Sequence, residues 1–197
     1  MDQSRDPRAA YFVTGGKSCD HWHLIGNDRI AATAHNGGYV QLYDWTRGGK
    51  ILNRSCPTER NYAGGFKFIQ MPDRSFCTLW EHLPKDASQQ RVFGVGYVTK
   101  TTSYSGLKVA ERIEAPWGDD PALVSTTLVE NGRATPLRVS VVEFWDVNLH
   151  PLTAAPIMTK GMRKAAQRRR AQLNRRFVMD AFWDEPLGAL GIDLSAA

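Results

Sequence analysis

Two pairs of adjacent carboxylates are the first residues in this sequence whose types could do chemistry. They are Asp119-Asp120 and Asp184-Glu185. Inverting cleavage of a glycosidic bond needs two carboxyl groups about 6.5–9.5 Å apart, one as general acid and one as general base. Neighbouring residues point their side chains in different directions, so neither pair meets this need by itself. Because Asp119-Asp120 precedes Pro121, we expect it to cap a turn, and the sequence predicts no catalytic residue.

Cys19, His21 and His23 form the second group with potential chemistry. On a strand, residues at i, i+2 and i+4 share one face, so the three side chains could offer a zinc ion three ligands. No fourth ligand is visible nearby, and the usual CxxC or HxxxH spacings are missing. We therefore expect a free cysteine and two ordinary strand histidines, and we predict neither a metal nor another cofactor.

Aromatic residues form the third group, because a flat ring can stack on the apolar face of a sugar. The candidates for carbohydrate contact are Trp117, Trp45, Trp80 and Tyr43, and Tyr39 shares a face with Tyr43 and Trp45 if residues 39–45 form a strand. Tryptophans of a β-sandwich are more often core or interface residues. Trp117 is the strongest candidate, since its loop is polar and rich in proline and glycine.

A basic run is the fourth group. Between Lys160 and Arg176 there are eight Lys or Arg residues and no Asp or Glu. Such a run can bind a nucleic-acid backbone by counterion release, but solvated helix faces are a commoner explanation. No aromatic residue interleaves the arginines before Phe177, so the pattern disfavours nucleic-acid binding.

The elements that must position these residues are strands. Residues 91–148 predict four consecutive strands, and from Leu107 to Ala115 apolar and polar residues largely alternate, as in a strand with one buried face. Tyr104-Ser105-Gly106 predicts one turn, and Asn131-Gly132 predicts a tight turn between the third and fourth strands. Residues 116–121, PWGDDP, predict a shaped loop that holds Trp117 at the rim of the sheet.

The rest of residues 1–150 continues the same pattern. Strand-like segments at 11–14, 21–25, 29–34, 39–45, 65–70 and 75–80 are separated by turn signals, with irregular loops expected at 46–64 and 81–90. This gives nine or ten strands before Leu149. We therefore predict an all-β fold, an antiparallel β-sandwich of the super-sandwich type, over residues 1–150.

Residues 151–197 differ in character. Residues 160–183 are rich in helix formers and contain no proline, so they predict one basic helix. The apolar run at 186–192 follows it. We expect this segment to continue into a further part of a longer enzyme.

Composition sets the broad class. The chain has 197 residues, a formal net charge of +5 and 42% apolar residues, enough for one domain with a core. Its three cysteines are widely spaced and do not predict a disulfide framework. Residues 1–12 carry charges where a secretory signal is apolar, and no stretch approaches the roughly 20 apolar residues of a membrane span. We expect a cytoplasmic protein with no membrane segment.

Several short motifs, in this order, resemble the N-terminal domain of one enzyme family, glycoside hydrolase family 94, formerly glycosyltransferase family 36. The resemblance covers about residues 11–150. Its motifs are Gly26-Asn27, Asn36-Gly37-Gly38-Tyr39, Ile51-Leu52-Asn53-Arg54, Phe93-Gly94-Val95-Gly96-Tyr97, Tyr104-Ser105-Gly106-Leu107, Glu111, Trp117-Gly118-Asp119-Asp120-Pro121, and the segment from Leu128 to Asn131.

The family includes cellobiose and chitobiose phosphorylases and the phosphorylase-like module of cyclic β-1,2-glucan synthases. The resemblance implies a β-sandwich that precedes a helical linker and an (α/α)6 catalytic barrel, where the general acid and the phosphate-binding residues reside. It also implies a carbohydrate partner and a homodimer in the parent enzyme. The chain departs from the family after residue 150, where it is more basic and more helical, and it is too short to contain the barrel.

Three functions therefore stay open. The first is a non-catalytic sandwich domain of a glycoside phosphorylase that supports the barrel and contacts β-glucan or a β-linked disaccharide. The second is a free-standing carbohydrate-binding module, for which binding should weaken when Trp117 becomes Ala. The third is a basic nucleic-acid-binding protein that uses residues 160–176, whose affinity should depend on salt.

Overall fold

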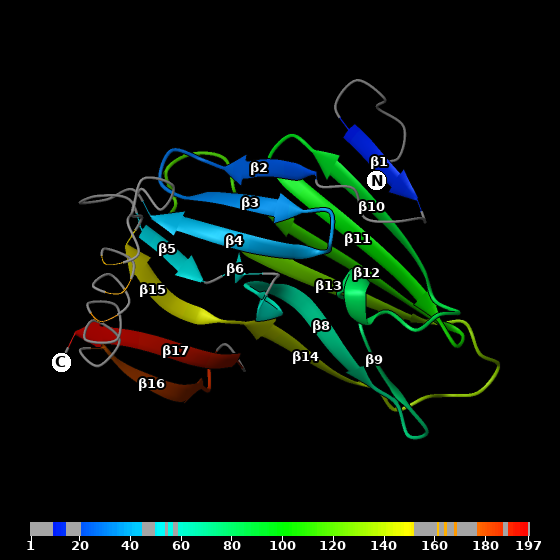
Figure 1. The fold of residues 1–197 in the computed structure, drawn as a ribbon. Helices are drawn as coiled ribbons and strands as arrows, with labels where there is room; N and C mark the ends of the chain where they lie inside the picture. Colours follow the sequence, from blue (N-terminus) through cyan, green and yellow to red (C-terminus); the bar gives the residue numbers. More distant parts are fainter. Residues whose placement is uncertain are drawn as a thin grey trace.

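The computed structural model describes residues 10–14, 21–44, 50–53, 55–56, 59–151, 161, 164, 168, 177–186 and 189–196. Within these residues antiparallel strands predominate and pack as two facing layers (Figure 1). The predicted all-β sandwich is therefore confirmed. Among the described residues, no helix is both long and apolar enough to cross a lipid bilayer.

One layer, which we call the meander sheet, has the strand order β1-β10-β11-β12-β13. Four of its strands follow one another along the chain, and the fifth comes from the N-terminal part. The strands are β1 (Ala10–Thr14), β10 (Ser88–Gly94), β11 (Tyr97–Tyr104), β12 (Leu107–Glu114) and β13 (Val124–Asn131).

The turn between β11 and β12 shows why these residues form hairpins. Ser105 and Gly106 both have positive φ, 50° and 79°, as a two-residue type I′ turn requires. The predicted turn at Tyr104-Ser105-Gly106 is therefore confirmed. The two strands it joins pair along their full length, from Tyr104 opposite Leu107 to Tyr97 opposite Glu114.

The other layer is built from two sheets. The N-terminal sheet has the order β15-β5-β4-β3-β2, and the β8 sheet has the order β14-β8-β9. A single residue, Asp146, separates β14 from β15, so these consecutive strands connect the two sheets. The strands are β2 (Trp22–Gly26), β3 (Ala31–His35), β4 (Tyr39–Asp44), β5 (Lys50–Asn53), β15 (Val147–Pro151), β8 (Gly64–Gln70), β9 (Ser75–Cys77) and β14 (Ser140–Trp145).

Two strand pairs and one turn of helix lie outside these three sheets. β6 (Ser55–Cys56) pairs with β7 (Asn61–Tyr62), and η3 (Trp80–His82) is one turn of 3-10 helix. β16 (Phe177–Asp184) pairs with β17 (Ala189–Ala196) as a hairpin.

Two apolar clusters hold the layers together. Ile25, Ala32 and Val40 of the N-terminal sheet pack with Phe93 and Ile113 of the meander sheet. The β8 sheet contributes a second cluster, in which Ile69, Met71 and Phe76 pack with Leu107 and Val109. Since β12 contributes to both clusters, it is the strand on which both sheets of the opposite layer rest.

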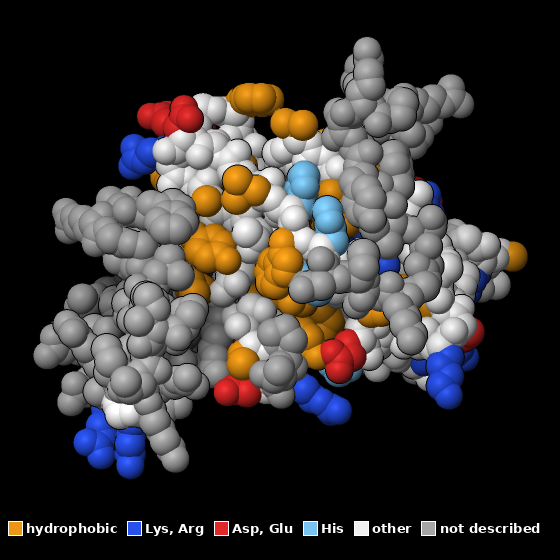
Figure 2. Space-filling view, turned by 45° about the horizontal axis from the view of Figure 1, so that its top comes forward, with side chains coloured by type: hydrophobic (Ala, Val, Ile, Leu, Met, Phe, Trp, Pro, Cys, Tyr) orange, Lys and Arg blue, Asp and Glu red, His pale blue; other side chains and the backbone are white. Residues whose placement is uncertain are grey.

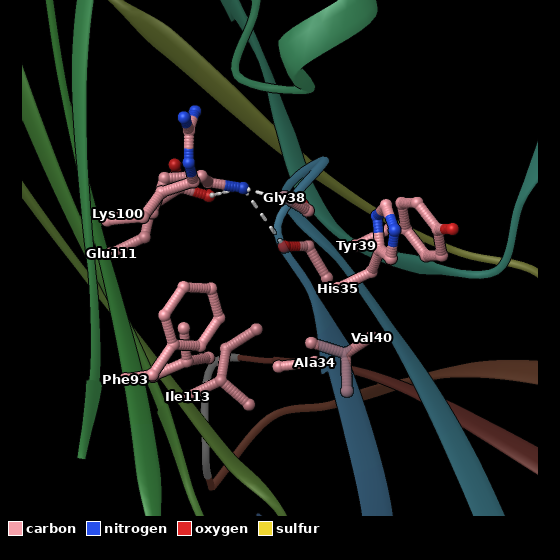
Figure 3. A pocket seen from close by; sticks show the side chains of 12 residues that line it. Ala34, His35, Gly38, Tyr39, Val40, Phe93, Lys100, Glu111 and Ile113 are labelled. Carbon is pink, nitrogen blue, oxygen red and sulfur yellow. Dashed lines mark hydrogen bonds and ion pairs between the residues drawn. The ribbon is translucent and has the colours of Figure 1, made fainter. Parts of the chain in front are cut away.

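The space between the layers also contains buried charges. Lys100 on β11 and Glu111 on β12 form an ion pair of 3.2 Å, and the lysine also donates to the carbonyl oxygens of Gly38 (3.0 Å) and Gly65 (3.3 Å) (Figure 3). Thr78 donates to the same carboxylate at 3.1 Å. Burial lowers the pKa of Lys100 and raises the pKa of Glu111. The pair therefore connects the meander sheet to backbone atoms of the opposite layer.

Two more buried cations lie in this interior. Lys67 reaches Glu143 at 2.6 Å and donates to Ser125 at 3.0 Å. Arg91 donates to Asn36 at 2.9 Å and to Gln89 at 2.7 Å. Each cation is 1% exposed. These ionic and hydrogen-bond partners offset part of the desolvation penalty of the two buried cations.

The strand prediction for residues 91–148 was incomplete. The structure has five strands and the start of a sixth, β15, there, because Val95-Gly96 forms a turn that splits the first predicted strand into β10 and β11 and Asp146 separates β14 from β15. A Cβ on Gly94 would lie 2.1 Å from the ring of Tyr97, so a side chain at this position would have to displace that ring. By Trp145 the described residues form fourteen strands, β1 to β14, and not nine or ten.

The tight hairpin predicted at Asn131-Gly132 was wrong. β13 ends at Asn131, and the chain crosses to the other layer, where β14 pairs with β8. Asn131 instead organises the crossing loop, since it donates to Thr135 O at 2.8 Å and accepts from the Arg133 amide at 3.1 Å. The irregular loop predicted at 46–64 was also wrong, because residues 50–53, 55–56 and 61–62 are strands.

The basic helix predicted at 160–183 does not extend to its predicted end. Gly161, Lys164 and Arg168 are helical, and the other residues up to Arg176 lie outside the described part of the chain. Residues 177–184 are strand β16, which pairs with residues 189–196, part of the apolar tail. Cross-strand pairing has therefore overridden helix propensity from Phe177 onward.

Candidate functional site

A groove of about 690 Å³ lies at the end of the sandwich where Trp117 projects. Three connections meet there, namely the β2–β3 turn, the β10–β11 turn and the loop between β12 and β13. Trp117 is 93% exposed, as predicted for a loop that holds an aromatic residue at the rim. The lining residues are Leu24, Gly26, Asn27, Asp28, Ile30, Ala31, Val95, Gly96, Arg112, Glu114, Ala115, Pro116, Trp117 and Gly118.

Hydrogen bonds fix two walls of this groove to each other. Asn27, in the β2–β3 turn, donates through its side-chain amide to the carbonyl oxygens of Pro116 (3.0 Å) and Asp120 (2.8 Å). The Asp28 amide donates to the carbonyl oxygen of Gly118 at 3.2 Å. The loop that carries Trp117 is therefore attached to the opposite layer.

Charged residues line the groove beside the aromatic ring. Arg112 donates twice to one oxygen of Glu114, through Nε at 2.8 Å and Nη2 at 2.6 Å. Its guanidinium carbon lies 4.1 Å from the centre of the Tyr97 ring, a cation–π contact. Both side chains of the ion pair are partly exposed, so their polar atoms can still reach a ligand. The groove therefore combines a planar aromatic surface with hydrogen-bond donors and acceptors.

The other predicted sugar-contact residues do not join Trp117. Trp80 belongs to η3, and its ring lies 4.4 Å from the guanidinium carbon of the buried Arg91. Tyr43 lies on β4, where its hydroxyl donates to Gln41 at 3.1 Å and lies 3.2 Å from the Thr33 hydroxyl. Neither residue lines the groove. Trp45 lies outside the described residues.

A separate aromatic cluster covers the outer face of the N-terminal sheet. The His35 ring stacks on Tyr39 with centroids 4.6 Å apart, and Trp22 meets His35 edge-on at 4.5 Å. Figure 2 shows hydrophobic side chains gathered over the middle of one face of the molecule, next to histidines. Tyr39 is 2% exposed, so the aromatic face predicted for residues 39–45 is partly packed and offers a less open surface than Trp117.

The predicted histidine pair has a structural role. His23 Nε2 lies 2.8 Å from the carbonyl oxygen of Gly94, and the His21 ring meets Phe93 edge-on at 4.7 Å. Cys19 lies outside the described residues. Within the part of the chain that the structure describes, no three His, Cys, Asp or Glu side chains are grouped to hold a metal ion.

The adjacent carboxylates lie where the sequence predicted loops or element ends. Asp119 and Asp120 are exposed in the loop after Trp117, and Asp120 contributes its backbone carbonyl to the contact with Asn27. Asp184 ends β16, and Glu185 follows in its turn. No carboxylate of these pairs lines the groove.

Sequence reasoning missed the neighbours of Trp117. Arg112 and Glu114 were expected on the wet face of a strand, and Asn27 was expected in a turn. The alternation of β12 was the available signal for Arg112 and Glu114, since i and i+2 share a face. Nothing local in the sequence indicates that Asn27 contacts a loop about 90 residues away along the chain.

Comparison with known proteins does not assign the chain to a family. No protein-family model matches it, and no curated protein matches it. The family-94 resemblance therefore depends on the motifs quoted in the sequence.

Proposed function

We propose that this chain is a non-catalytic, carbohydrate-contacting β-sandwich domain of a glycoside phosphorylase of the family-94 type. Its functions would be to support the catalytic barrel of the parent enzyme and to contact a β-glucan or β-linked disaccharide through the Trp117 groove. The observation that carries the carbohydrate part is the almost fully exposed Trp117 beside Arg112, Glu114 and Asp28 in a groove of about 690 Å³.

The chemistry of a sugar matches the composition of this groove. A pyranose ring has one apolar C–H face, which can pack on an indole, and hydroxyls that both donate and accept hydrogen bonds. Glu114 and Asp28 can accept from hydroxyls, and Arg112 can donate to them. Trp117 shares the groove with two further exposed apolar side chains, Leu24 (68%) and Val95 (69%), and grouped exposed apolar residues are typical of binding grooves, which supports a binding role for Trp117.

The charges of the groove favour a neutral sugar. The charged lining residues are two carboxylates, Asp28 and Glu114, and one guanidinium, Arg112, which is already paired with Glu114. A phosphorylated sugar would gain little from the paired cation and would be repelled by Asp28. We therefore expect neutral oligosaccharides to bind in preference to sugar phosphates.

Calorimetric titration with a series of β-linked gluco-oligosaccharides tests the proposal. We expect saturable binding that weakens roughly tenfold or more in Trp117→Ala, because the variant loses the stacking surface. Trp22→Ala is the matched control, since Trp22 is also exposed (44%) but lies outside the groove. A flat titration with the unmodified chain would contradict carbohydrate contact.

A second assay tests the non-catalytic part of the proposal. The purified chain is incubated with inorganic phosphate and β-linked disaccharides, and sugar 1-phosphate is measured. We expect none, because neither adjacent carboxylate pair, Asp119-Asp120 or Asp184-Glu185, lines the groove, and Glu114, one of the two carboxylates that do line it, is held in an ion pair with Arg112. Release of sugar 1-phosphate above the level of a heat-denatured control would overturn this part.

A further inference from the structure

Asn27 makes an unusually complete set of hydrogen bonds for a residue in a surface turn. Its side-chain oxygen accepts from the amides of Arg29 (2.9 Å) and Ile30 (3.0 Å), which shapes the β2–β3 turn. Its side-chain nitrogen donates to Pro116 O and Asp120 O, which belong to the loop between β12 and β13. One side chain therefore organises its own turn and holds the distant loop.

The two carbonyl oxygens that accept from Asn27 flank Trp117. Pro116 directly precedes it and Asp120 follows three residues later, so the amide group bridges the base of the loop segment that presents the ring. The Asp28 amide adds a third contact, to Gly118 O at 3.2 Å. Between Glu114, the end of β12, and Val124, the start of β13, the other backbone hydrogen bonds donated by this segment are those of the Ala115 amide to Gly96 O (3.2 Å) and of the Ala122 amide to Asp120 O (2.7 Å). The position of this segment therefore depends strongly on its contacts with Asn27 and Asp28.

From this geometry we infer that Asn27 is a positioning residue, which holds the backbone around Trp117 in the position that forms the groove and so makes the groove ready for its ligand before binding. The part of this inference that concerns affinity rests on the proposed carbohydrate function. Without the hydrogen bonds of the Asn27 side-chain nitrogen, the loop samples other positions. The apparent affinity then falls in proportion to the fraction of molecules whose loop keeps the binding-competent position.

Asn27→Asp separates the contacts made by the side-chain oxygen of Asn27 from those made by its side-chain nitrogen. The aspartate keeps an acceptor oxygen for the amides of Arg29 and Ile30, but it loses both donors and places a carboxylate against two carbonyl oxygens. Asn131→Asp is the matched control. Asn131 also donates to a loop carbonyl and accepts from an amide two residues later, but it lies outside the groove.

The first measurement is hydrogen exchange of the whole chain without ligand. In Asn27→Asp we expect exchange to accelerate about tenfold or more in peptides that cover residues 26–31 and 115–123, because two hydrogen bonds are lost. In Asn131→Asp these peptides should exchange as in the unmodified chain. Unchanged exchange in Asn27→Asp would overturn the inference that Asn27 holds the loop between β12 and β13.

The second measurement is the titration with β-linked gluco-oligosaccharides. We expect Asn27→Asp to weaken binding about tenfold, and Asn131→Asp to leave it unchanged. If the exchange accelerates and affinity stays the same, the positioning role is wrong. If the unmodified chain binds no oligosaccharide, the proposed function fails, and the exchange experiment still decides whether Asn27 holds the loop.

Discussion

Strand β12 carries two ion-paired glutamates on opposite faces, and their surroundings differ. Glu111 faces the interior, where it pairs with Lys100 and is 2% exposed. Glu114 faces outward, where it pairs with Arg112, and both side chains keep about a third of their surface in water. The same strand therefore supports the interior with one face and the groove with the other.

The comparison shows how environment decides what an ion pair does. In the interior a lost partner leaves a charge that water cannot solvate, so removal of one partner destabilises the fold whether or not the intact pair adds net stability. At the surface water replaces a lost partner, so the pair contributes little to stability and its atoms remain available to a ligand. Changes to the two pairs should therefore separate stability from binding.

The largest effect is expected for Glu111→Ala. This variant leaves the ammonium of Lys100 buried without its counter-charge and removes the acceptor of Thr78. We expect the free energy of unfolding to fall by about 3–5 kcal/mol, measured by urea denaturation. A loss below about 1 kcal/mol, the value typical of surface pairs, would show that burial does not increase the cost of removing one partner of this pair.

Replacing both partners should cost less than removing one. In Lys100→Met with Glu111→Leu no charge is left buried, although Gly38 O and Gly65 O lose their donor. We expect the double variant to be more stable than Glu111→Ala by about 1–3 kcal/mol, because buried pairs are often replaceable by apolar residues. A double variant less stable than Glu111→Ala would mean that the lysine is needed mainly for its backbone contacts.

The interior pair should also give stability an unusual pH dependence. Burial lowers the pKa of Lys100 from 10.5, so its contribution is fully present above pH 10.5 and is lost as pH falls through the folded-state pKa. Burial raises the pKa of Glu111 from 4.5, so its contribution is present below pH 4.5 and is lost as pH rises through the folded-state pKa.

The two contributions together predict a minimum between pH 4.5 and pH 10.5 in the unfolding free energy of the unmodified chain relative to the double variant. Urea denaturation of both proteins across this range measures the difference. A maximum in that interval would mean that the attraction between the two charges outweighs their desolvation.

The smallest effect on stability is expected for Arg112→Ala. We expect a loss of about 0–1 kcal/mol, because the pair with Glu114 is partly solvated. The same variant should weaken oligosaccharide binding, since it removes a donor and a wall of the groove. Urea denaturation and calorimetry on one preparation test both statements. A stability loss as large as that of Glu111→Ala would contradict the expectation that the outward-facing ion pair of β12 contributes less to stability than the interior one.

Local chemistry explains which parts of the fold were predictable. Ser105-Gly106 and the alternation from Leu107 onward specify a hairpin within a few residues, so that prediction was confirmed. The turn at Val95-Gly96 was missed because it lies in a continuous strand-like run without Asn or Pro. The partner of β14 was not predictable, because it lies about 70 residues earlier, in β8.

The same distinction applies to the candidate site. The exposure of Trp117 followed from the prolines and glycine of its own loop. Its grouping with Arg112 and Asn27 depended on antiparallel register and on a contact between opposite layers, which no local pattern encodes. The strand at 177–184 replaced the end of a predicted helix for a different reason, because it forms a hairpin with residues 189–196 and this pairing outweighs its helix propensity.

The outermost strand of the meander sheet has a consequence for how the protein is made. β1 pairs with β10, with Ala10 opposite Gly94, although strands β2 to β9 lie between the two in the sequence. During synthesis the segment that becomes β1 leaves the ribosome long before β10. Strands β10 to β13, in contrast, can pair with one another as consecutive hairpins. We therefore expect β1 to be the last strand to join this sheet, and until then the free edge of β10 is open to pairing with other chains.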